Sequence, residues 1–120
     1  MNFVRGKVEK GSLRFGNKYL DLSWKLKDKL KSYEGKDIVF GFRPESIELE
    51  KRQDAYRIDC KVELTEMLGD NTNVYVNVDN DKAILKVDPH DTPEVDSDFT
   101  FYIPYESVYL FDGETEVVIK

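Results

Sequence analysis

The residues of this chain that could take part in catalysis are few and far apart. The single histidine, His90, lies in the proline-flanked segment Asp88-Pro89-His90-Asp91, which we predict to be an exposed loop. A general base there would need a nucleophile, and neither serine nor cysteine adjoins it. The one cysteine, Cys60, lies in an alternating apolar stretch without an adjacent histidine or basic cluster, so we expect a small buried side chain. No catalytic residue is predicted.

Metal and nucleotide sites can be tested against fixed spacings. Acidic residues crowd the segment 88–98, but an EF-hand needs ligands at set offsets, a central glycine and a distal glutamate, and this pattern is missing. An ATP-binding P-loop needs glycine, four residues, then Gly-Lys-Ser/Thr. The Gly-Lys pairs at Gly6 and Gly35 are not followed by serine or threonine. We therefore predict no metal, no cofactor and no ATP site in this chain.

Composition narrows the class of protein. The chain has 120 residues, which fits one domain or two small subdomains, and its 40% hydrophobic and 35% charged content is typical of a globular protein. A formal net charge of -6 opposes binding to a phosphate backbone. One cysteine excludes an intramolecular disulfide and favours a reducing, cytoplasmic compartment. No apolar run approaches the ~20 residues that span a bilayer, so membrane association would depend on another protein.

The elements that must position any site are mostly strands. Apolar residues alternate with period two in several short segments separated by glycine- and asparagine-containing turns, and this pattern predicts strands. The predicted strands cover residues 3–8, 13–15, 19–22, 39–42, 56–64, 72–78, 82–87 and 99–103. We expect a mostly β fold, either a small barrel or a pair of barrel-like halves of the OB type.

One segment has a different period. Over residues 24–33 the apolar residues Leu26, Leu30 and Tyr33 recur at helical spacing, Ser23 precedes them, and Gly35 follows where a helix commonly ends. This pattern predicts one short helix. The lysines of the segment Lys25 to Lys36 are interrupted by acidic residues, which favours a solvated face over an anion-binding patch.

The run Gly41-Phe42-Arg43-Pro44-Glu45 closes one predicted strand. Proline cannot continue a central strand but suits the first turn of a helix, and an acidic residue is favourable there, so we predict a single helical turn toward Leu49. Arg43 either pairs with a carboxylate such as Glu45 or faces a partner chain or an anion.

Four segments together resemble a known family. They are Met1-Asn2-Phe3, Gly41 to Glu45, Glu66-Met67-Leu68-Gly69-Asp70-Asn71-Thr72 and Tyr109-Leu110-Phe111-Asp112. In this order they resemble the C-terminal domain, including the module called TOBE, of MalK/UgpC-type ATP-binding subunits of sugar ABC importers.

The resemblance implies an OB-like or TOBE-type small β-barrel in which residues 1–120 form a single regulatory domain, or two interleaved β-barrel halves. It implies a non-catalytic regulatory and dimerisation role, with ATP and magnesium bound by an N-terminal ATPase domain that is absent from this chain. Implied partners are a second copy of the subunit, membrane permease subunits and a regulatory protein, but no nucleic acid. The implied location is cytoplasmic, on the inner face of the cell membrane.

The family pattern also suggests site residues. Candidates for the regulatory or interface surface are Arg43, Glu45, Glu66, Gly69, Phe111 and Asp112. Of these, Glu66, Gly69 and Phe111 are the main candidates, with core packing as the alternative for Phe111. Two features depart from the family: the Lys-rich segment, and the sequence Val95-Asp96-Ser97-Asp98, where family members usually carry a turn glycine.

Two other functions stay open. TOBE modules elsewhere bind oxyanions, and a small-ligand module of this kind would use Arg43, Arg52 or Arg57. An OB-type nucleic-acid binder would need aromatic and basic residues interleaved on one strand face. Tyr56-Arg57 and Tyr75 hardly suffice for that requirement, and the acidic net charge opposes nucleic-acid binding.

Overall fold

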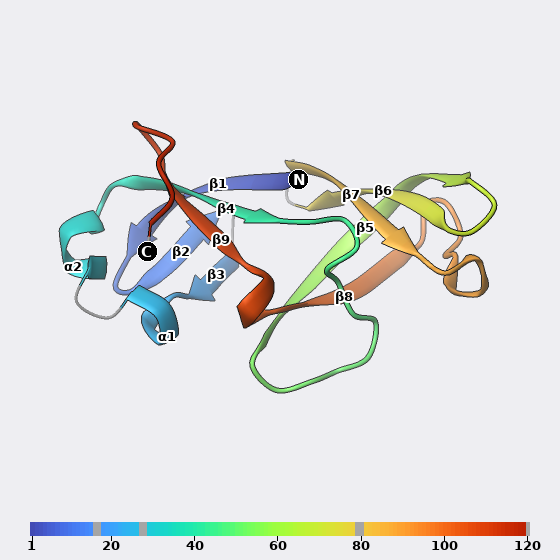
Figure 1. Ribbon diagram of the computed structural model, residues 1–120, viewed down its shortest axis with the longest axis horizontal. Helices are drawn as coiled ribbons and strands as arrows, with labels where there is room; N and C mark the ends of the chain where they lie inside the picture. The colour runs from blue at the N-terminus through green and yellow to red at the C-terminus, as the bar shows by residue number, and fades with distance from the viewer. Residues whose placement is uncertain (16–17, 27–28, 79–80, 120) are drawn as a thin grey trace. The chain divides into compact units, whose positions relative to one another are not determined.

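The computed structural model of the protein describes residues 1–15, 18–26, 29–78 and 81–119 (Figure 1). The chain divides into two compact units. One, here called the five-stranded unit, consists of Phe3–Gly41 and Tyr109–Lys120, and the other, the four-stranded unit, consists of Met1–Asn2 and Phe42–Val108. Each unit is built on an antiparallel sheet, which confirms the predicted mostly β fold.

The sheet of the five-stranded unit has the order β3-β2-β1-β4-β9. Its strands are β1 (Asn2–Glu9), β2 (Ser12–Phe15), β3 (Lys18–Asp21), β4 (Asp37–Phe42) and β9 (Tyr109–Asp112). A two-residue turn joins β1 to β2, and both of its residues have positive φ, 51° at Lys10 and 80° at Gly11, as a type I′ hairpin requires. The buried side chains of this unit are Val4, Val8, Leu13, Phe15, Leu20, Leu22, Ile38, Phe40, Leu110 and Ile119.

Within the region of the predicted helix, the described residues form the helical segments α1 (Ser23–Leu26) and α2 (Lys29–Tyr33). Residues 27 and 28, which the predicted helix included, lie outside the described residues. The backbone N–H of Ser23 donates to Asp21 Oδ1 at 2.9 Å, so a carboxylate outside the helix holds its start. Gly35, with φ 78°, follows α2 in the left-handed conformation expected after a helix.

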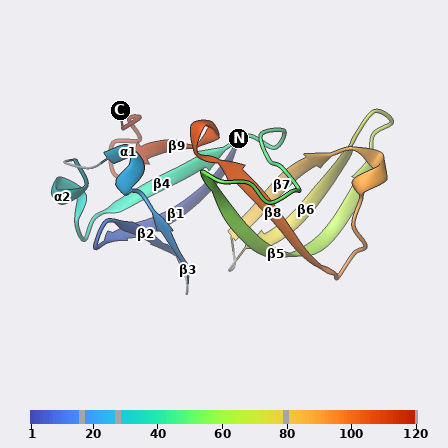
Figure 2. The ribbon, with the colours of Figure 1, turned by 90° about the horizontal axis from the view of Figure 1, so that it is seen from below.

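The sheet of the four-stranded unit has the order β7-β6-β5-β8 (Figure 2). Its strands are β5 (Ala55–Met67), β6 (Thr72–Val78), β7 (Asp81–Val87) and β8 (Asp98–Pro104), with short 3-10 helices η1 (Pro89–Asp91) and η2 (Tyr105–Ser107) beside β8. The buried apolar side chains are Phe42, Tyr56, Ile58, Val62, Val74, Val76, Val78, Ala83, Leu85, Val87, Phe101, Ile103 and Val108.

Both edges of this sheet are partly covered by backbone or side-chain partners. On β7, the Asn2 carboxamide accepts from the Ile84 N–H and donates to the Ile84 carbonyl, both at 2.8 Å. Farther along β7, the N–H of Lys86 donates to the Pro44 carbonyl. On β8, Glu48 and Tyr102 exchange backbone hydrogen bonds of 2.8 and 2.7 Å. Covered edges protect a sheet from pairing with other chains.

Two local predictions are corrected. The strand predicted over residues 56–64 was expected to alternate regularly to its end, but a β-bulge between Val62 and Leu64 shifts the register. Leu64 therefore lies 55% exposed beside Tyr75 and does not continue the buried face. The predicted helical turn after Arg43 is a β-turn closed by the Ser46 N–H and the Arg43 carbonyl at 3.0 Å. Proline at the second position of such a turn fits its fixed φ.

The turn that precedes β8 has no glycine at residues 95–98, where family members usually carry one. Asp96 takes the left-handed conformation, with φ 68°, and its N–H donates to the Val62 carbonyl at 2.8 Å. Aspartate tolerates this conformation better than most non-glycine residues. The departure from the family pattern is therefore accommodated locally.

Candidate partner-binding surfaces

The sheet of the five-stranded unit has an outer face. The part of it formed by β1, β4 and β9 is here called the β1–β4–β9 face. Side chains alternate between the two faces along each strand. The buried Val4 and Val8 of β1 point to the inner face, so Phe3, Arg5 and Lys7 lie on the outer face. The outward residues of the other two strands follow from the pairs Val39↔Phe111 and Gly41↔Tyr109.

Aromatic side chains occupy one part of this face. The rings of Phe3 and Phe111 meet edge to face, with centroids 5.9 Å apart and planes at 69°. Phe3 is 54% exposed and Tyr109 is 37% exposed, while Phe111 is half-buried. Val118, 40% exposed, forms a β-bridge with Phe111. Phe111 therefore packs on the outer surface of the sheet, whereas its neighbour Leu110 is buried in the core.

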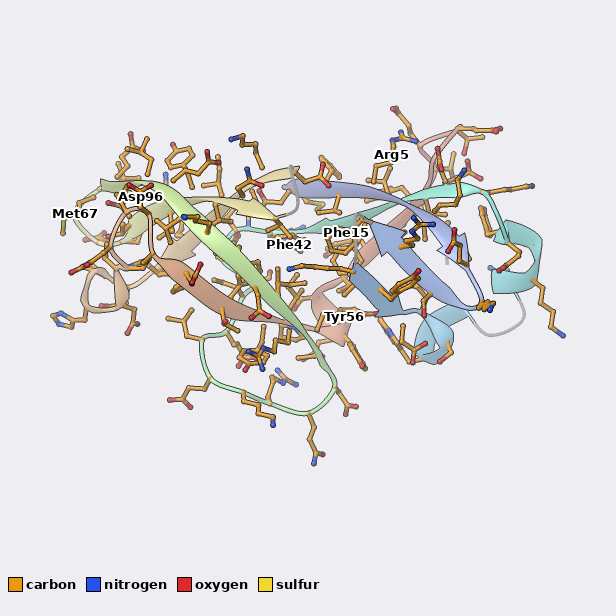
Figure 3. All side chains as sticks on the ribbon, turned by 180° about the vertical axis from the view of Figure 1, so that it is seen from behind. Arg5, Phe15, Phe42, Tyr56, Met67 and Asp96 are labelled. Carbon is orange, nitrogen blue, oxygen red and sulfur yellow. The ribbon has the colours of Figure 1, made fainter. Side chains whose placement is uncertain are left out.

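A polar hollow lies at the end of the same strands. It has a volume of 290 Å³ and is lined by Arg5, Lys7, Tyr33, Gly35, Lys36, Asp37, Asp112, Gly113 and Glu114. Figure 3 shows the Arg5 side chain extending away from the ribbon. The Arg5 guanidinium donates to the Gly113 carbonyl at 3.2 Å and lies 3.9 Å from the Asp37 carboxylate. Among the described residues, neither Lys7 nor Glu114 has an oppositely charged side chain within 4.0 Å.

Asp112 organises the turn that follows β9. Its Oδ1 accepts from the backbone N–H groups of Glu114 and Thr115 at 2.8 and 3.1 Å, and its Oδ2 accepts from the Tyr33 hydroxyl at 3.1 Å. These hydrogen bonds, the two backbone ones foremost, lower the pKa of Asp112 below its ordinary value. Burial and the neighbouring carboxylate raise the pKa of Tyr33. The geometry gives Asp112 a structural task within its own chain.

The candidates Glu66 and Gly69 lie on the hairpin between β5 and β6. Glu66 is paired with Asn73 across the strands, and its Oε1 accepts from Asn73 Nδ2 at 3.4 Å and from the Tyr75 hydroxyl at 3.5 Å. Gly69 has φ 89° at the first central position of the turn, which is typical of type II′. A side chain there would meet nothing within 4 Å.

The end of this hairpin is apolar and exposed. Met67 is 69% exposed and Leu68 is 53% exposed. Figure 3 shows Met67 at one end of the four-stranded unit's sheet. This hairpin tip is therefore a second candidate surface, separate in sequence from the β1–β4–β9 face.

The two remaining candidates, Arg43 and Glu45, are exposed in the β-turn after β4. The other arginines considered for anion binding are engaged elsewhere. Arg52 bonds to Glu48 at 2.6 Å and to Glu106 at 3.3 Å, and Arg57 bonds to Asp59 at 3.2 Å.

The structure brings Phe111 and Asp112 together on β9, and Glu66 and Gly69 together on one hairpin. The sequence analysis missed Phe3, Arg5 and Lys7 as members of a surface. Their signal was available, because they alternate with Val4, Gly6 and Val8 along β1. The proximity of Tyr33 to Asp112 had no signal, since 79 positions separate them.

The single histidine and the single cysteine belong to neither of these two surfaces. His90 is exposed in η1, as expected of a loop histidine, and its N–H donates to Asp88 Oδ1. Cys60 is half-buried, and its thiol donates to the Phe99 carbonyl at 3.3 Å. In the described parts of the chain, no three His, Cys, Asp or Glu side chains gather as metal ligands would. Nor does any described helix have the length and apolar character needed to cross a membrane.

Comparisons with protein-family models match nearly the whole chain. Residues 1–47 match the MalK OB fold domain, and residues 40–111 match the TOBE domain. The overlap of the two matches falls on β4 and the turn after it.

Curated relatives are named as import or transport ATP-binding proteins. The oligosaccharides import ATP-binding protein MsmX of Bacillus subtilis is 32% identical over 126 residues, covering 100% of this chain and 34% of that protein. The multiple sugar-binding transport ATP-binding protein MsmK of Streptococcus mutans is 29% identical, covering 75% of this chain and 25% of its own length. The sn-glycerol-3-phosphate import ATP-binding protein UgpC of Escherichia coli is 26% identical, covering 96% and 32%. The chain thus spans about a third, or less, of the length of these relatives.

A solved structure shares the fold. ModG, a cytoplasmic molybdate-binding protein, superposes with a TM-score of 0.68 over 91% of this chain and 94% of its own, at 15% sequence identity. At this identity the likeness concerns the fold alone.

Proposed function

The chain belongs to the TOBE domain family, and on that premise we propose that it is the non-catalytic C-terminal regulatory and dimerisation domain of the ATP-binding subunit of a carbohydrate ABC importer. The observation that carries the proposal is the pair of family matches, the MalK OB fold domain at 1–47 and the TOBE domain at 40–111, on a chain that aligns with MsmX from end to end. The resemblance drawn from four short segments is confirmed by these matches.

The division of work within such a subunit follows from the sequence. This chain has no phosphate-cradling Gly-Lys-Ser/Thr segment, so ATP and magnesium would bind to a part of the subunit outside it. The relatives' names mention oligosaccharides, multiple sugars and sn-glycerol-3-phosphate. A domain of this type would therefore occur in transporters of different substrates, and other components of each transporter would choose the substrate.

The structural support for dimerisation is the exposed aromatic part of the β1–β4–β9 face. Phe3 and Tyr109 expose large apolar surfaces beside Phe111, and contiguous exposed apolar surface marks interaction sites. A contact of this size would be weak by itself, because association must offset lost rotational and translational freedom. Tethering to a second dimer contact in the ATPase part would raise its effective concentration and make it count.

The partners and location follow from the same proposal. The subunit would lie on the cytoplasmic side of the membrane, held there by the permease subunits, and its dimer partner would be a second copy of itself. The hairpin tip, with Met67 and Leu68 exposed, is the surface we propose for a regulatory protein, because it is apolar and projects from the sheet.

The alternative functions are less well supported by the described residues. An oxyanion module would need free arginines, and Arg52 and Arg57 are paired with carboxylates. A nucleic-acid binder would need exposed aromatic and basic side chains on one strand face, and the Tyr75 hydroxyl donates to the Glu66 carboxylate instead.

Sedimentation equilibrium of the 120-residue chain up to millimolar concentration tests the proposal. We expect a weak monomer–dimer equilibrium that Phe111→Ala shifts toward monomer. Tyr19→Ala, which removes a 59% exposed ring from β3 of the same unit, is the matched control and should leave the equilibrium unchanged.

Thermal unfolding distinguishes an interface role of Phe111 from a packing role. If Phe111→Ala unfolds the domain, the sedimentation experiment is repeated with Phe3→Ser, because Phe3 is more than half exposed. A chain that stays monomeric at every concentration contradicts the proposed dimerisation.

A further inference from the structure

We propose that the polar hollow of the five-stranded unit binds a small metabolite that carries one phosphate group and several hydroxyl groups. The hollow lies wholly within this unit and is lined by residues of β1, α2 and β4 and of the turn after β9. The inference goes beyond the proposed function and does not depend on self-association, because every group that it uses comes from one chain.

Basic side chains form one part of the wall of the hollow. Arg5 and Lys7 come from β1, and Lys36 directly precedes β4. In the five-stranded unit as a whole basic residues outnumber acidic ones, although the chain has a formal net charge of -6. A local excess of positive charge around a concave surface raises the local concentration of anions.

These basic groups can donate to a ligand. Among the described residues, neither Lys7 nor Lys36 has a carboxylate within 4.0 Å of its ammonium group. Arg5 donates to the Gly113 carbonyl at 3.2 Å, and its contact with Asp37 is longer, at 3.9 Å. A phosphate monoester carries about two negative charges at neutral pH. It would accept charge-assisted hydrogen bonds from both lysines and from the remaining guanidinium N–H groups.

The acidic side chains of the hollow differ in what they can still accept. The oxygens of Asp112 already accept two backbone N–H groups and the Tyr33 hydroxyl, and Asp37 lies beside Arg5. Glu114 has no cation within 4.0 Å among the described residues, so its carboxylate can accept hydrogen bonds from hydroxyl groups of a ligand. The Tyr33 oxygen, which donates its own proton to Asp112, can accept another.

Donors and acceptors are therefore separated within one hollow. The cations suit a phosphate group, and the Glu114 carboxylate suits hydroxyl groups. A bare anion would use only the cations and would be repelled by Glu114. A neutral sugar would gain nothing from the charge of the lysines. A phosphorylated polyol or sugar uses both parts.

The backbone around the hollow is fixed before any ligand binds. The N–H of Gly35 donates to the Val8 carbonyl at 2.8 Å, and the N–H of Gly113 donates to the Asp37 carbonyl at 3.0 Å. A Cβ at Gly35 would meet nothing within 4 Å, so the space beside this residue is open. The volume of 290 Å³ suits a small metabolite, because ligand clefts begin at roughly 300 Å³. A preformed wall lowers the ordering cost of binding.

Glucose 6-phosphate is the probe that tests the site. Titrated into the labelled chain at low salt, it should shift the amide NMR signals of Gly35 and Gly113, which line the hollow. The signal of Gly69, on the hairpin of the other unit, should stay in place. Because each exposed ionic contact is weak, we expect a saturable dissociation constant of about 1–10 mM. Shifts that do not saturate would overturn the proposal.

Two further ligands identify the class. Inorganic phosphate should bind about tenfold more weakly than glucose 6-phosphate, because it lacks the hydroxyl contacts, and glucose should cause no shift. If inorganic phosphate binds as tightly as glucose 6-phosphate, the hollow is a site for a free anion and the proposed ligand class is wrong. Binding of glucose alone would likewise contradict it.

Variants assign the contacts. Lys7→Gln should weaken the binding of glucose 6-phosphate about fivefold. Lys31→Gln is the matched control, since it removes the same charge from an exposed residue of α2 outside the hollow, and it should change nothing. Glu114→Ala should weaken glucose 6-phosphate but strengthen inorganic phosphate, because it removes both an acceptor and a repulsive charge. Equal losses in the two lysine variants would show general attraction to the unit and no specific site.

The outcomes separate this inference from the proposed function. A chain that binds none of the three ligands disproves the site, and the self-association measured by sedimentation is unaffected. A chain that stays monomeric contradicts the proposed dimerisation, while saturable binding of glucose 6-phosphate to the same chain would still establish the site.

Discussion

The Tyr33 hydroxyl donates a 3.1 Å hydrogen bond to Asp112 Oδ2, joining the end of α2 to the end of β9 across 79 positions of the chain. The same carboxylate accepts two backbone N–H groups of the following turn. One side chain thus holds a helix, a strand end and a turn together.

Acid should weaken this arrangement. Because the folded pKa of Asp112 is lowered, its contribution to stability is fully present above the unfolded pKa, about 3.9, and is lost as the pH falls through the folded value. Urea unfolding midpoints measured across this range should fall for the unmodified chain. Asp112→Asn should show a lower midpoint at neutral pH and a smaller fall in acid. Identical pH profiles for the two proteins would show that Asp112 does not contribute in this way.

Gly113 should not tolerate a side chain. A Cβ there would lie 2.4 Å from the Asp37 carbonyl oxygen, which belongs to the backbone of β4 and cannot move aside cheaply. We expect Gly113→Ala to lower the free energy of unfolding by about 1–3 kcal/mol. Lys36→Ala, a change at an exposed neighbouring residue, should be close to neutral in the same urea titration. An unchanged Gly113→Ala variant would mean that β4 and β9 can separate at this point without loss.

Asp96→Gly should stabilise the fold. Asp96 has φ 68°, a conformation that costs a non-glycine residue on the order of 1 kcal/mol relative to glycine. Asp98→Gly is the matched control, because Asp98 begins β8 in extended backbone, where glycine is unfavourable. Thermal unfolding should therefore move in opposite directions for the two variants. A lower melting temperature for Asp96→Gly would show that its side chain stabilises the turn more than the backbone strain destabilises it.

Mg-ATP should not bind to this chain. Its sequence has no P-loop, and in the proposed function ATP binds to another part of the subunit. Isothermal titration of the chain with Mg-ATP should give no binding heat. A saturable site of micromolar affinity would contradict the non-catalytic, regulatory assignment.

The strand pattern was predictable where alternation is long, as in Val74, Val76 and Val78 of β6. The prediction from alternation failed where a local insertion changes the period, because the bulge after Val62 turns Leu64 outward. β9 was not predicted as a strand, since four residues after a 3-10 helix give too short a period to recognise. The β1–β4–β9 face depends on that strand pairing with β4, a long-range contact that local pattern cannot supply.

The pairing of Gly41 with Tyr109 gives the chain an unusual covalent order. Residues 42–108, which form the four-stranded unit together with Met1–Asn2, begin and end at two hydrogen-bonded neighbours of one sheet, so in chain order most of this unit is nested between β4 and β9. Once the nested unit has folded, the loop that must close to bring β9 to β4 is effectively short, and its closure entropy is correspondingly small. Synthesis from the N-terminus would complete the inner unit before the outer sheet receives its last strand.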